Sequence, residues 1–271
     1  MEAKSTEKAF SFTTPFAFLG GIVLDWVNGL GALIIFLAKA FLLIFQPKQL
    51  PLIIHQVYFI GARSAKIVMM VGLFTGMVLG LQMYYVTVKF GAEGVLGSAV
   101  ALSLIRELGP VLTAIMIVAR AGSAMTAELG ILRISEQIDA LDTMLINPIR
   151  YLISPRIAAS IISFPILTAF FDLVGIIGGY FTGVILLGVN AGVYFNRIIS
   201  DVDLQDVTGG FIKSLVFAVL VCTICCYQGY FTHVLSESRG AKGVSLSTTS
   251  AVVQSCVFIL VADYVVTSFL L

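Results

Sequence analysis

Five long apolar stretches decide what this chain can fold into. They cover residues 67–88, 97–129, 157–189, 211–235 and 246–271, and each reaches the roughly 20 residues that an α-helix needs to cross a bilayer. Helices are expected, because a bilayer offers no water to pair with backbone polar groups. The chain is 59% hydrophobic and only 11% charged, whereas soluble domains are about 25% charged. The sequence therefore predicts an all-α polytopic membrane protein with five transmembrane helices.

The first 66 residues follow a different pattern. The apolar run 22–45 is interrupted by Asp25, Asn28 and Lys39. The next segment, 49–66, carries apolar residues at helical spacing, and its polar residues fall elsewhere on the helix. We interpret residues 1–66 as a cytoplasmic tail followed by membrane-interfacial helices, and residues 67–271 as one five-helix membrane domain.

The distribution of basic residues sets the expected orientation. If 22–45 does not span and the N-terminus is cytoplasmic, the inside segments hold eleven Lys and Arg residues and the outside loops hold three. The three are Lys89, Arg197 and Lys213, the last near the membrane edge. A spanning helix at 22–45 would split the first basic group across the bilayer. Hydropathy alone still supports a sixth span there, so that alternative stays open.

Charged residues lie within the second apolar stretch. Arg106 and Glu107 are about ten residues into it, and Arg120 and Glu128 approach its cytoplasmic end. Charges at membrane depth are costly and usually face a protein interior or a water-filled cavity. Adjacent residues do not face each other on a helix, so Arg106 and Glu107 are expected to have separate partners. They fit either an interhelical ion pair or a polar cavity, whereas Arg120 fits a structural role better.

A short amphipathic segment follows the second stretch. Its apolar stripe is formed by Ile134, Ile138, Leu141 and Leu145, and acidic residues occupy another face. Pro148 disfavours helix at the preceding residue. The pattern predicts a cytoplasmic helix at about 132–146, whose acidic face fits a basic protein partner better than a membrane surface.

Two glycine stripes recur at every fourth residue. They are Gly72, Gly76 and Gly80, and Gly175, Gly179 and Gly183. Such small-residue patterns let helix backbones approach closely. We expect tight helix packing here, within one subunit or between subunits.

Motifs for chemistry are missing. The sequence has no phosphate-binding G-x-x-x-x-G-K-[ST], no G-x-S-x-G, no H-E-x-x-H and no cluster of metal ligands. No basic patch with interleaved aromatic residues suggests nucleic acid. We therefore expect a protein that is not an enzyme, binds no metal and uses no cofactor of its own.

Several blocks in order resemble one family. They are GLFTGMVLGLQ at 72–82, LIRELGPVL at 104–112, ARAGSAMTAELG at 119–130, EQIDAL at 136–141 and NPIRY at 147–151. From about residue 56 to its end, the chain is similar to the permease subunit of the Mla-type, MCE-associated ABC lipid transporters, the MlaE family.

The resemblance implies a homodimeric permease in a bacterial inner membrane. Its partners would be a cytoplasmic ATPase that holds ATP and Mg²⁺ and a periplasmic MCE-domain protein, and its substrate a phospholipid moved between the inner membrane and the outer envelope. The resemblance implies that the helix which couples to the ATPase contains Glu136, Gln137, Ile138, Asp139, Ala140 and Leu141. It also implies that the lipid cavity is lined by Leu79, Gln82, Val86, Phe90, Arg106 and Glu107.

An ion-coupled secondary transporter is the alternative function. It would use Asp172, Asp263 or Glu107 as coupling carboxylates, and such transporters often contain inverted repeats. We find no repeat in the sequence, and the spacing of the carboxylates forms no relay, so a structural role for Asp172 and Asp263 is favoured.

Overall fold

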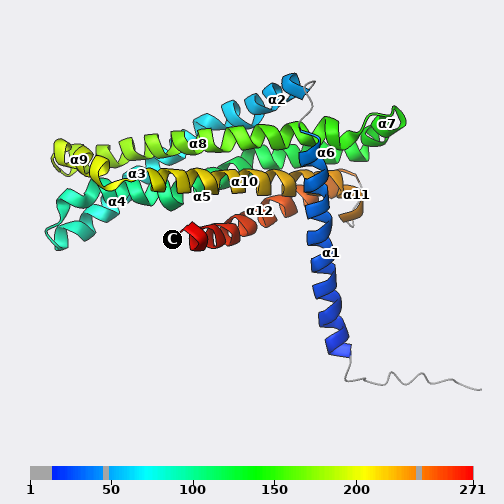
Figure 1. The fold of residues 1–271 in the computed structure, drawn as a ribbon, viewed down its shortest axis with the longest axis horizontal. Helices are drawn as coiled ribbons and strands as arrows, with labels where there is room; N and C mark the ends of the chain where they lie inside the picture. Colours follow the sequence, from blue (N-terminus) through cyan, green and yellow to red (C-terminus); the bar gives the residue numbers. More distant parts are fainter. Residues whose placement is uncertain (1–13, 45–48, 236–239, 271) are drawn as a thin grey trace, which may run out of the picture.

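The computed structural model describes residues 14–44, 49–235 and 240–270, and all regular structure in these ranges is helical. Long helices run side by side in an elongated bundle (Figure 1). Along its length lie α8 (Ser154–Tyr180), α10 (Leu204–Tyr230) and the segment from α5 (Gly109–Ile117) to α6 (Ser123–Ile134). Within these ranges, five helical segments are long and apolar enough to cross a membrane. The expected all-α fold with five such helices is thereby confirmed.

The first of these segments is longer than predicted. Leu50–Lys89 forms a continuous helical run of 40 residues, made of α2 (Leu50–Val57), a π-helical turn (Tyr58–Ala62) and α3 (Arg63–Lys89). A straight helix of that length measures about 60 Å, roughly twice the hydrocarbon core of a bilayer. The predicted boundary at residue 66 therefore falls inside a helix, and the interfacial placement of 49–66 stays a prediction.

The second segment, Glu93–Ile134, is broken twice by π-helical turns. A single 3₁₀ turn (Glu93–Val95) leads into α4 (Leu96–Ser103), and a π-turn (Leu104–Leu108) separates α4 from α5 (Gly109–Ile117). A second π-turn (Val118–Gly122) leads into α6 (Ser123–Ile134). Both π-turns contain a charged residue, and π-turns inside helices are frequent at functional sites.

The remaining segments complete the bundle. A π-turn (Ile149–Ile153), α8 (Ser154–Tyr180) and another π-turn (Phe181–Leu186) form the third, α10 (Leu204–Tyr230) the fourth and α12 (Ala241–Leu270) the fifth. The fourth ends before the predicted residue 235, because a turn at Phe231 separates α10 from the short α11 (Thr232–Leu235). Hydropathy continues through that turn and does not reveal it.

The helix predicted at 132–146 is shorter in the structure. Helix α6 continues to Ile134, and α7 covers only Gln137–Thr143. Glu136 and Leu145 adopt left-handed backbone angles, with φ of 57° and 61°. These two residues turn the chain at each end of α7, and residues other than glycine rarely adopt such angles. The Asn147 side chain then accepts the backbone N–H of Ile149 at 3.0 Å, so this residue starts the next helical segment.

The two glycine stripes face each other within one chain. A Cβ added to Gly76 on α3 would overlap the backbone of Gly175 on α8, and one added to Gly80 would meet Gly179. Gly72 lies against the backbone of Phe171 in the same way. The close approach joins α3 to α8 along their length, since only a hydrogen atom fits between the two backbones.

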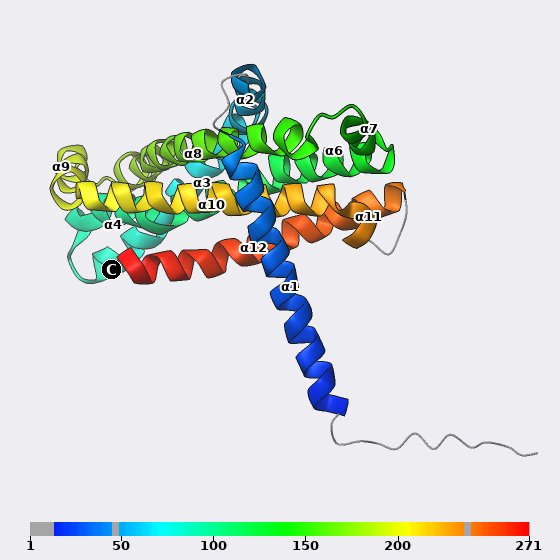
Figure 2. The same cartoon turned by 45° about the vertical axis from the view of Figure 1, so that its right-hand side comes forward.

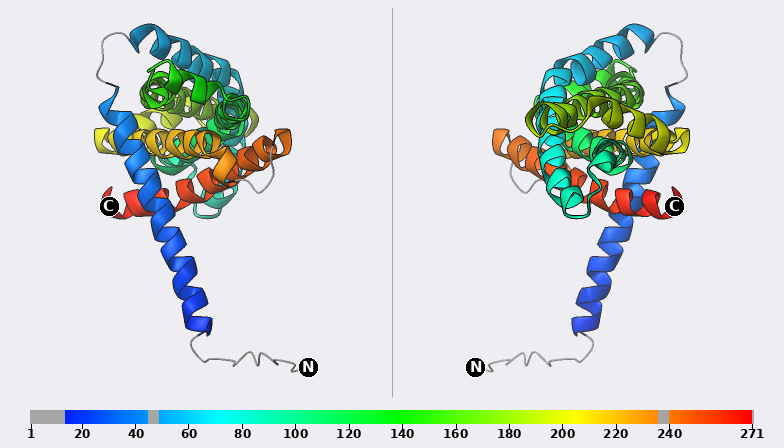
Figure 3. Two further views of the ribbon diagram at one scale, coloured as in Figure 1. Left: turned by 90° about the vertical axis from the view of Figure 1, so that its right-hand side faces the viewer. Right: turned by 90° about the vertical axis from the view of Figure 1, so that its left-hand side faces the viewer.

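The bundle has two distinct ends. The turns around α7 and α11 lie at one end, and α4 and α9 (Ala191–Asp201) lie at the other (Figure 2). Helix α1 (Thr14–Leu42) packs near the first end through Phe36 and Ala40. The N-terminal part of the helix extends away from the bundle, crosswise to the long helices, as the end-on views show (Figure 3). Its described apolar part, Val27–Leu42, is shorter than a span.

Candidate substrate cavity and coupling helix

The π-turn between α4 and α5 exposes a main-chain carbonyl. Pro110 has no N–H, so it cannot donate to the carbonyl of Arg106, four residues earlier. The ammonium group of Lys213 on α10 donates to that oxygen instead, at 2.9 Å. Gly210, one turn before Lys213, brings α10 close, because a Cβ there would overlap the carbonyl oxygen of Ile105. Proline and glycine together place a lysine against the break in the second span.

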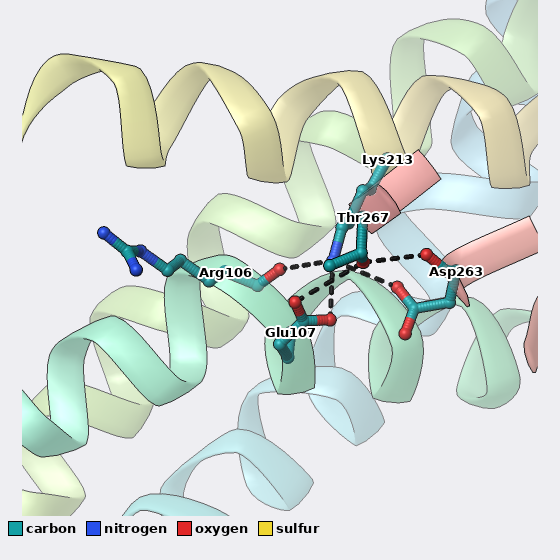
Figure 4. Close-up of polar contacts among 5 residues, drawn as sticks. All are labelled: Arg106, Glu107, Lys213, Asp263 and Thr267. Atoms are coloured by element: carbon teal, nitrogen blue, oxygen red, sulfur yellow. Dashed lines mark hydrogen bonds and ion pairs between the residues drawn. The ribbon is translucent and has the colours of Figure 1, made fainter. Parts of the chain in front are cut away.

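Lys213 is the centre of an ion cluster. Its side chain is only 2% exposed, and its Nζ lies 2.5 Å from Glu107 Oε2 and 3.2 Å from Asp263 Oδ1. Thr267 on α12 donates to the other oxygen of Glu107 at 3.5 Å. The ammonium group donates hydrogen bonds to the Arg106 carbonyl and to Glu107, and its contact with Asp263 is an ion pair. The cluster therefore ties α10 to the second and fifth spans (Figure 4).

The side chain of Arg106 points away from this cluster (Figure 4). Its Nε and NH2 lie 2.7 and 2.6 Å from Asp206 Oδ1, in the first turn of α10. Asp206 also closes a capping box with Asp203 at the start of that helix. Arg106 and Glu107 thus have separate partners, as their adjacent positions predict. Arg106 remains half-exposed, whereas the lysine beside it is buried.

A polar cavity of about 270 Å³ opens beside these side chains. Arg106 and Glu107 line it with Asp206, Lys213 and Thr267. Charged groups of both signs therefore face one water-accessible space near the α9 end of the bundle. The structure brings together these two predicted cavity residues and adds the lysine and the acidic residues of α10.

A second, apolar cavity of about 380 Å³ lies along α3. Leu79 lines it with Met70, Phe74 and Val78, and Leu108 also lines it from the π-turn that carries Arg106 and Glu107. The remaining predicted cavity residues do not line either space. Gln82 and Val86 are exposed farther along α3, and Phe90 is 79% exposed at its end.

Helix α7 forms a separate site at the opposite end of the bundle. Ile138 is fully buried and anchors it, whereas Glu136, Gln137, Asp139 and Ala140 are exposed and Leu141 is half-buried. An ion pair of 2.7 Å joins Asp139 to Arg133 at the end of α6. The helix therefore presents a largely acidic and polar surface on a single apolar anchor.

Arg120 has a structural position, as expected from the sequence. Its NH1 donates to the carbonyl of Phe59 at 2.7 Å and to Ser64 Oγ at 3.1 Å, and its guanidinium lies 5.5 Å from the Phe59 ring. Phe59 belongs to the π-turn between α2 and α3. Arg120 therefore binds a main-chain carbonyl of a π-turn, as Lys213 does at Arg106. This contact fixes the first span against the second.

Sequence reasoning does not find the partners of Arg106 and Glu107. It places Lys213 near the membrane edge and Asp206 in an outside loop. Both residues are about a hundred positions from Arg106 and Glu107, and no sequence pattern pairs them with these residues. The acidic residue Asp263 inside an apolar run is the one feature that indicates a buried cation nearby. Asp172, also predicted to be structural, lies against Gly109, where a Cβ would overlap its carboxylate.

Comparison with known proteins agrees with this architecture. A family model described as the permease MlaE matches residues 53–269. This range includes all five candidate spans, apart from residues 50–52 of the first and residue 270 of the fifth. The chain belongs to the MlaE permease family.

Three relatives illustrate the range of the MlaE family. The chain is 41% identical to the intermembrane phospholipid transport system permease protein MlaE of Haemophilus influenzae, over 92% of this chain and 95% of the relative. A probable ABC transporter permease protein of Rickettsia typhi is 40% identical over 89% and 91% of the two chains. The chloroplastic protein TRIGALACTOSYLDIACYLGLYCEROL 1 of Arabidopsis thaliana is 36% identical, over 77% of this chain and 58% of its own.

Proposed function

We propose that this chain is the permease subunit of an ATP-driven transporter that moves phospholipids between the inner membrane and the outer envelope of a bacterium. The observation that carries the proposal is the similarity to the MlaE protein of Haemophilus influenzae, which extends over almost the whole of both chains. The chain would sit in the inner membrane with its N-terminus in the cytoplasm and would act as a homodimer.

The two cavities support an amphipathic substrate. The polar cavity holds Arg106, Glu107 and Lys213, and the apolar cavity lies on α3. The same five-residue π-turn contributes to both, with Glu107 and Leu108 on the two sides. A lipid headgroup fits the first environment and acyl chains fit the second, because each group is then placed in a medium of its own polarity.

The second site supports a soluble partner. Helix α7 presents exposed acidic and polar residues at the end of the bundle opposite α4 and α9 (Figure 1). We propose that it docks into a cytoplasmic ATPase, which holds ATP and Mg²⁺, and that a periplasmic MCE-domain protein receives or delivers the lipid at the other end. The permease itself would then need no cofactor.

Affinity purification in mild detergent tests this function. Mass spectrometry is expected to find an ATPase subunit, an MCE-domain protein and bound phospholipid with the permease. The variant Glu136→Lys with Asp142→Lys is expected to lose the ATPase and to keep the permease folded, because both changes lie on the exposed face of α7 or at its end. Recovery of the permease without any ATPase would contradict the proposal.

An ion-coupled transporter remains the second candidate, because Glu107 and Asp263 share a single ammonium group. Carboxylates at membrane depth serve as proton carriers in pumps and transporters. Purified permease in liposomes distinguishes the two functions. Transport along a proton gradient without an ATPase would favour the second candidate, and strict dependence on ATP would exclude it.

A further inference from the structure

Arg133, the penultimate residue of α6, contacts two other elements through one guanidinium group. NH1 donates to Asp139 Oδ1 of α7 at 2.7 Å, and Nε donates to His233 Nδ1 of α11 at 3.0 Å. NH2 lies 3.1 Å from the other ring nitrogen of His233. The guanidinium also lies 5.6 Å from the centre of the Tyr230 ring, at the last residue of α10. The side chain is only 17% exposed.

These contacts join α7 to the end of a membrane-spanning helix. On the α7 side, the joint consists of the ion pair with Asp139 beside the buried Ile138. On the other side, the His233 ring stacks on Phe231 with ring centres 6.5 Å apart, and Phe231 lies 6.0 Å from Phe36 of α1. The Arg133 side chain therefore links α7 to α10 and α11, and the aromatic contacts of His233 and Phe231 extend this link to α1.

We propose that Arg133 is a positioning residue that transmits movement of α7 to the α10–α11 junction. This proposal rests on the proposed function, in which α7 docks into the ATPase. Helix α10 carries Lys213, so the helix that Arg133 contacts at one end also holds the ion cluster of the polar cavity near its other end. Arg133 itself touches neither the nucleotide nor the lipid.

Arginine suits this position for a geometric reason. Its planar fork offers five fixed donors and a flat face, so it binds a carboxylate and an imidazole and stacks on an aromatic ring at the same time. A lysine has the same charge but no such fork. In the variant Arg133→Lys, the ammonium group would reach Asp139 or His233 but not both, so the joint between the two elements would be lost while the charge stays.

His233 adds a dependence on pH. Its Nδ1 accepts a hydrogen bond from Arg133 only when the ring is neutral at that nitrogen. The charged and titratable groups around it are Arg133 from α6, Asp139 from α7 and Tyr230 from α10. Burial and then the nearby guanidinium lower the pKa of His233 below its usual value of 6.5. The neutral form is favoured, and protonation at lower pH places two cations face to face.

The experiment uses the permease reconstituted in liposomes with its co-purifying ATPase and a fluorescent phosphatidylethanolamine as probe. The measured quantity is lipid transferred per ATP hydrolysed. Arg133→Gln and Arg133→Lys are both expected to lower this ratio about tenfold, because each breaks a charge-assisted hydrogen bond within the joint. Co-purification of the ATPase and its rate of hydrolysis are expected to change much less.

His233→Leu and His55→Leu form a matched pair. His55 is exposed on α2, far along the chain from the joint, and these are the two histidines of the sequence. His233→Leu is expected to lower the ratio and His55→Leu to leave it unchanged. His233→Asn, which keeps an acceptor that does not titrate, is expected to retain activity and to abolish the decline that we expect of the wild-type ratio as the pH falls through the lowered pKa of His233.

The outcomes separate the two proposals. If the wild-type permease binds no ATPase, the proposed function fails and the role of Arg133 fails with it. If the wild-type complex transports lipid with ATP and both Arg133→Lys and His233→Leu keep the same ratio, the role of Arg133 alone is overturned. If Arg133→Gln does not fold, Arg133→Lys and the variants of the exposed His233 test the proposal in its place.

Discussion

Lys213 and Glu107 lie 106 positions apart in the sequence, and their side chains meet at 2.5 Å inside the bundle. The lysine is almost fully buried, whereas the glutamate is partly exposed to the polar cavity. This pair, with Asp263 as a second carboxylate in the ion cluster, fixes three of the five candidate spans around the break before Pro110. The positions of the walls of the polar cavity therefore depend on the ammonium group of Lys213.

Replacing the central lysine tests that dependence. Lys213→Met is expected to lower the free energy of unfolding by about 3 kcal/mol or more, because two carboxylates then face each other without their cation. Arg106→Gln is the control and is expected to cost about 1 kcal/mol or less, since its guanidinium is half-exposed. Melting temperatures in detergent measure both, and equal shifts would contradict a central role for Lys213.

The glycine seam between α3 and α8 gives a second prediction. Gly76→Ala is expected to cost about 1–3 kcal/mol, because the added methyl group overlaps the backbone of Gly175 and forces the helices apart. Gly31→Ala on α1 is the control, since no atom lies within 4 Å of its Cβ position. The control is expected to be neutral or to stabilise α1 slightly, as alanine favours helix. A Gly76→Ala protein that melts like the wild type would refute close packing.

The junction of α2 and α3 depends on Arg120. Arg120→Leu is expected to leave the Phe59 carbonyl without its cationic donor and to speed hydrogen exchange of the amides in Tyr58–Ala62. Ser64→Ala removes one acceptor of the guanidinium and is expected to cost only about 1 kcal/mol. Exchange rates measured by mass spectrometry distinguish the two variants. An unchanged rate in Arg120→Leu would rule out a role of Arg120 in holding the junction of α2 and α3.

The anchor of α7 can be tested in the same way. Ile138→Ala is expected to weaken the attachment of α7 by about 2–4 kcal/mol, because a fully buried side chain is removed. Hydrogen exchange in Gln137–Thr143 is expected to rise while the melting temperature of the bundle changes little. Leu145→Ala serves as control, since Leu145 is 95% exposed. Equal exchange in both variants would show that Ile138 is no anchor.

The class of fold could be predicted from the sequence because hydropathy is a local property. Five apolar stretches of sufficient length allow only helices in a bilayer, and the stripe of small residues around Gly76 indicates close packing without naming the partner. The helix boundaries could not be predicted as closely. The end of α10 before Phe231 and the short α7 follow from backbone turns, which hydropathy does not detect, and Glu136 adopts an angle that its residue type does not favour.

By itself, the sequence determined that the chain is helical, that charges lie within its second span and that an acidic helix follows that span. Only the tertiary structure decided which groups those charges meet. Lys213 reaches Glu107, and Arg133 joins Asp139 to His233, through contacts between segments up to about a hundred residues apart. Such contacts depend on the relative rotation of packed helices, and that rotation is set by the close approach at glycines such as Gly76 and Gly210, not by the pattern of any single helix.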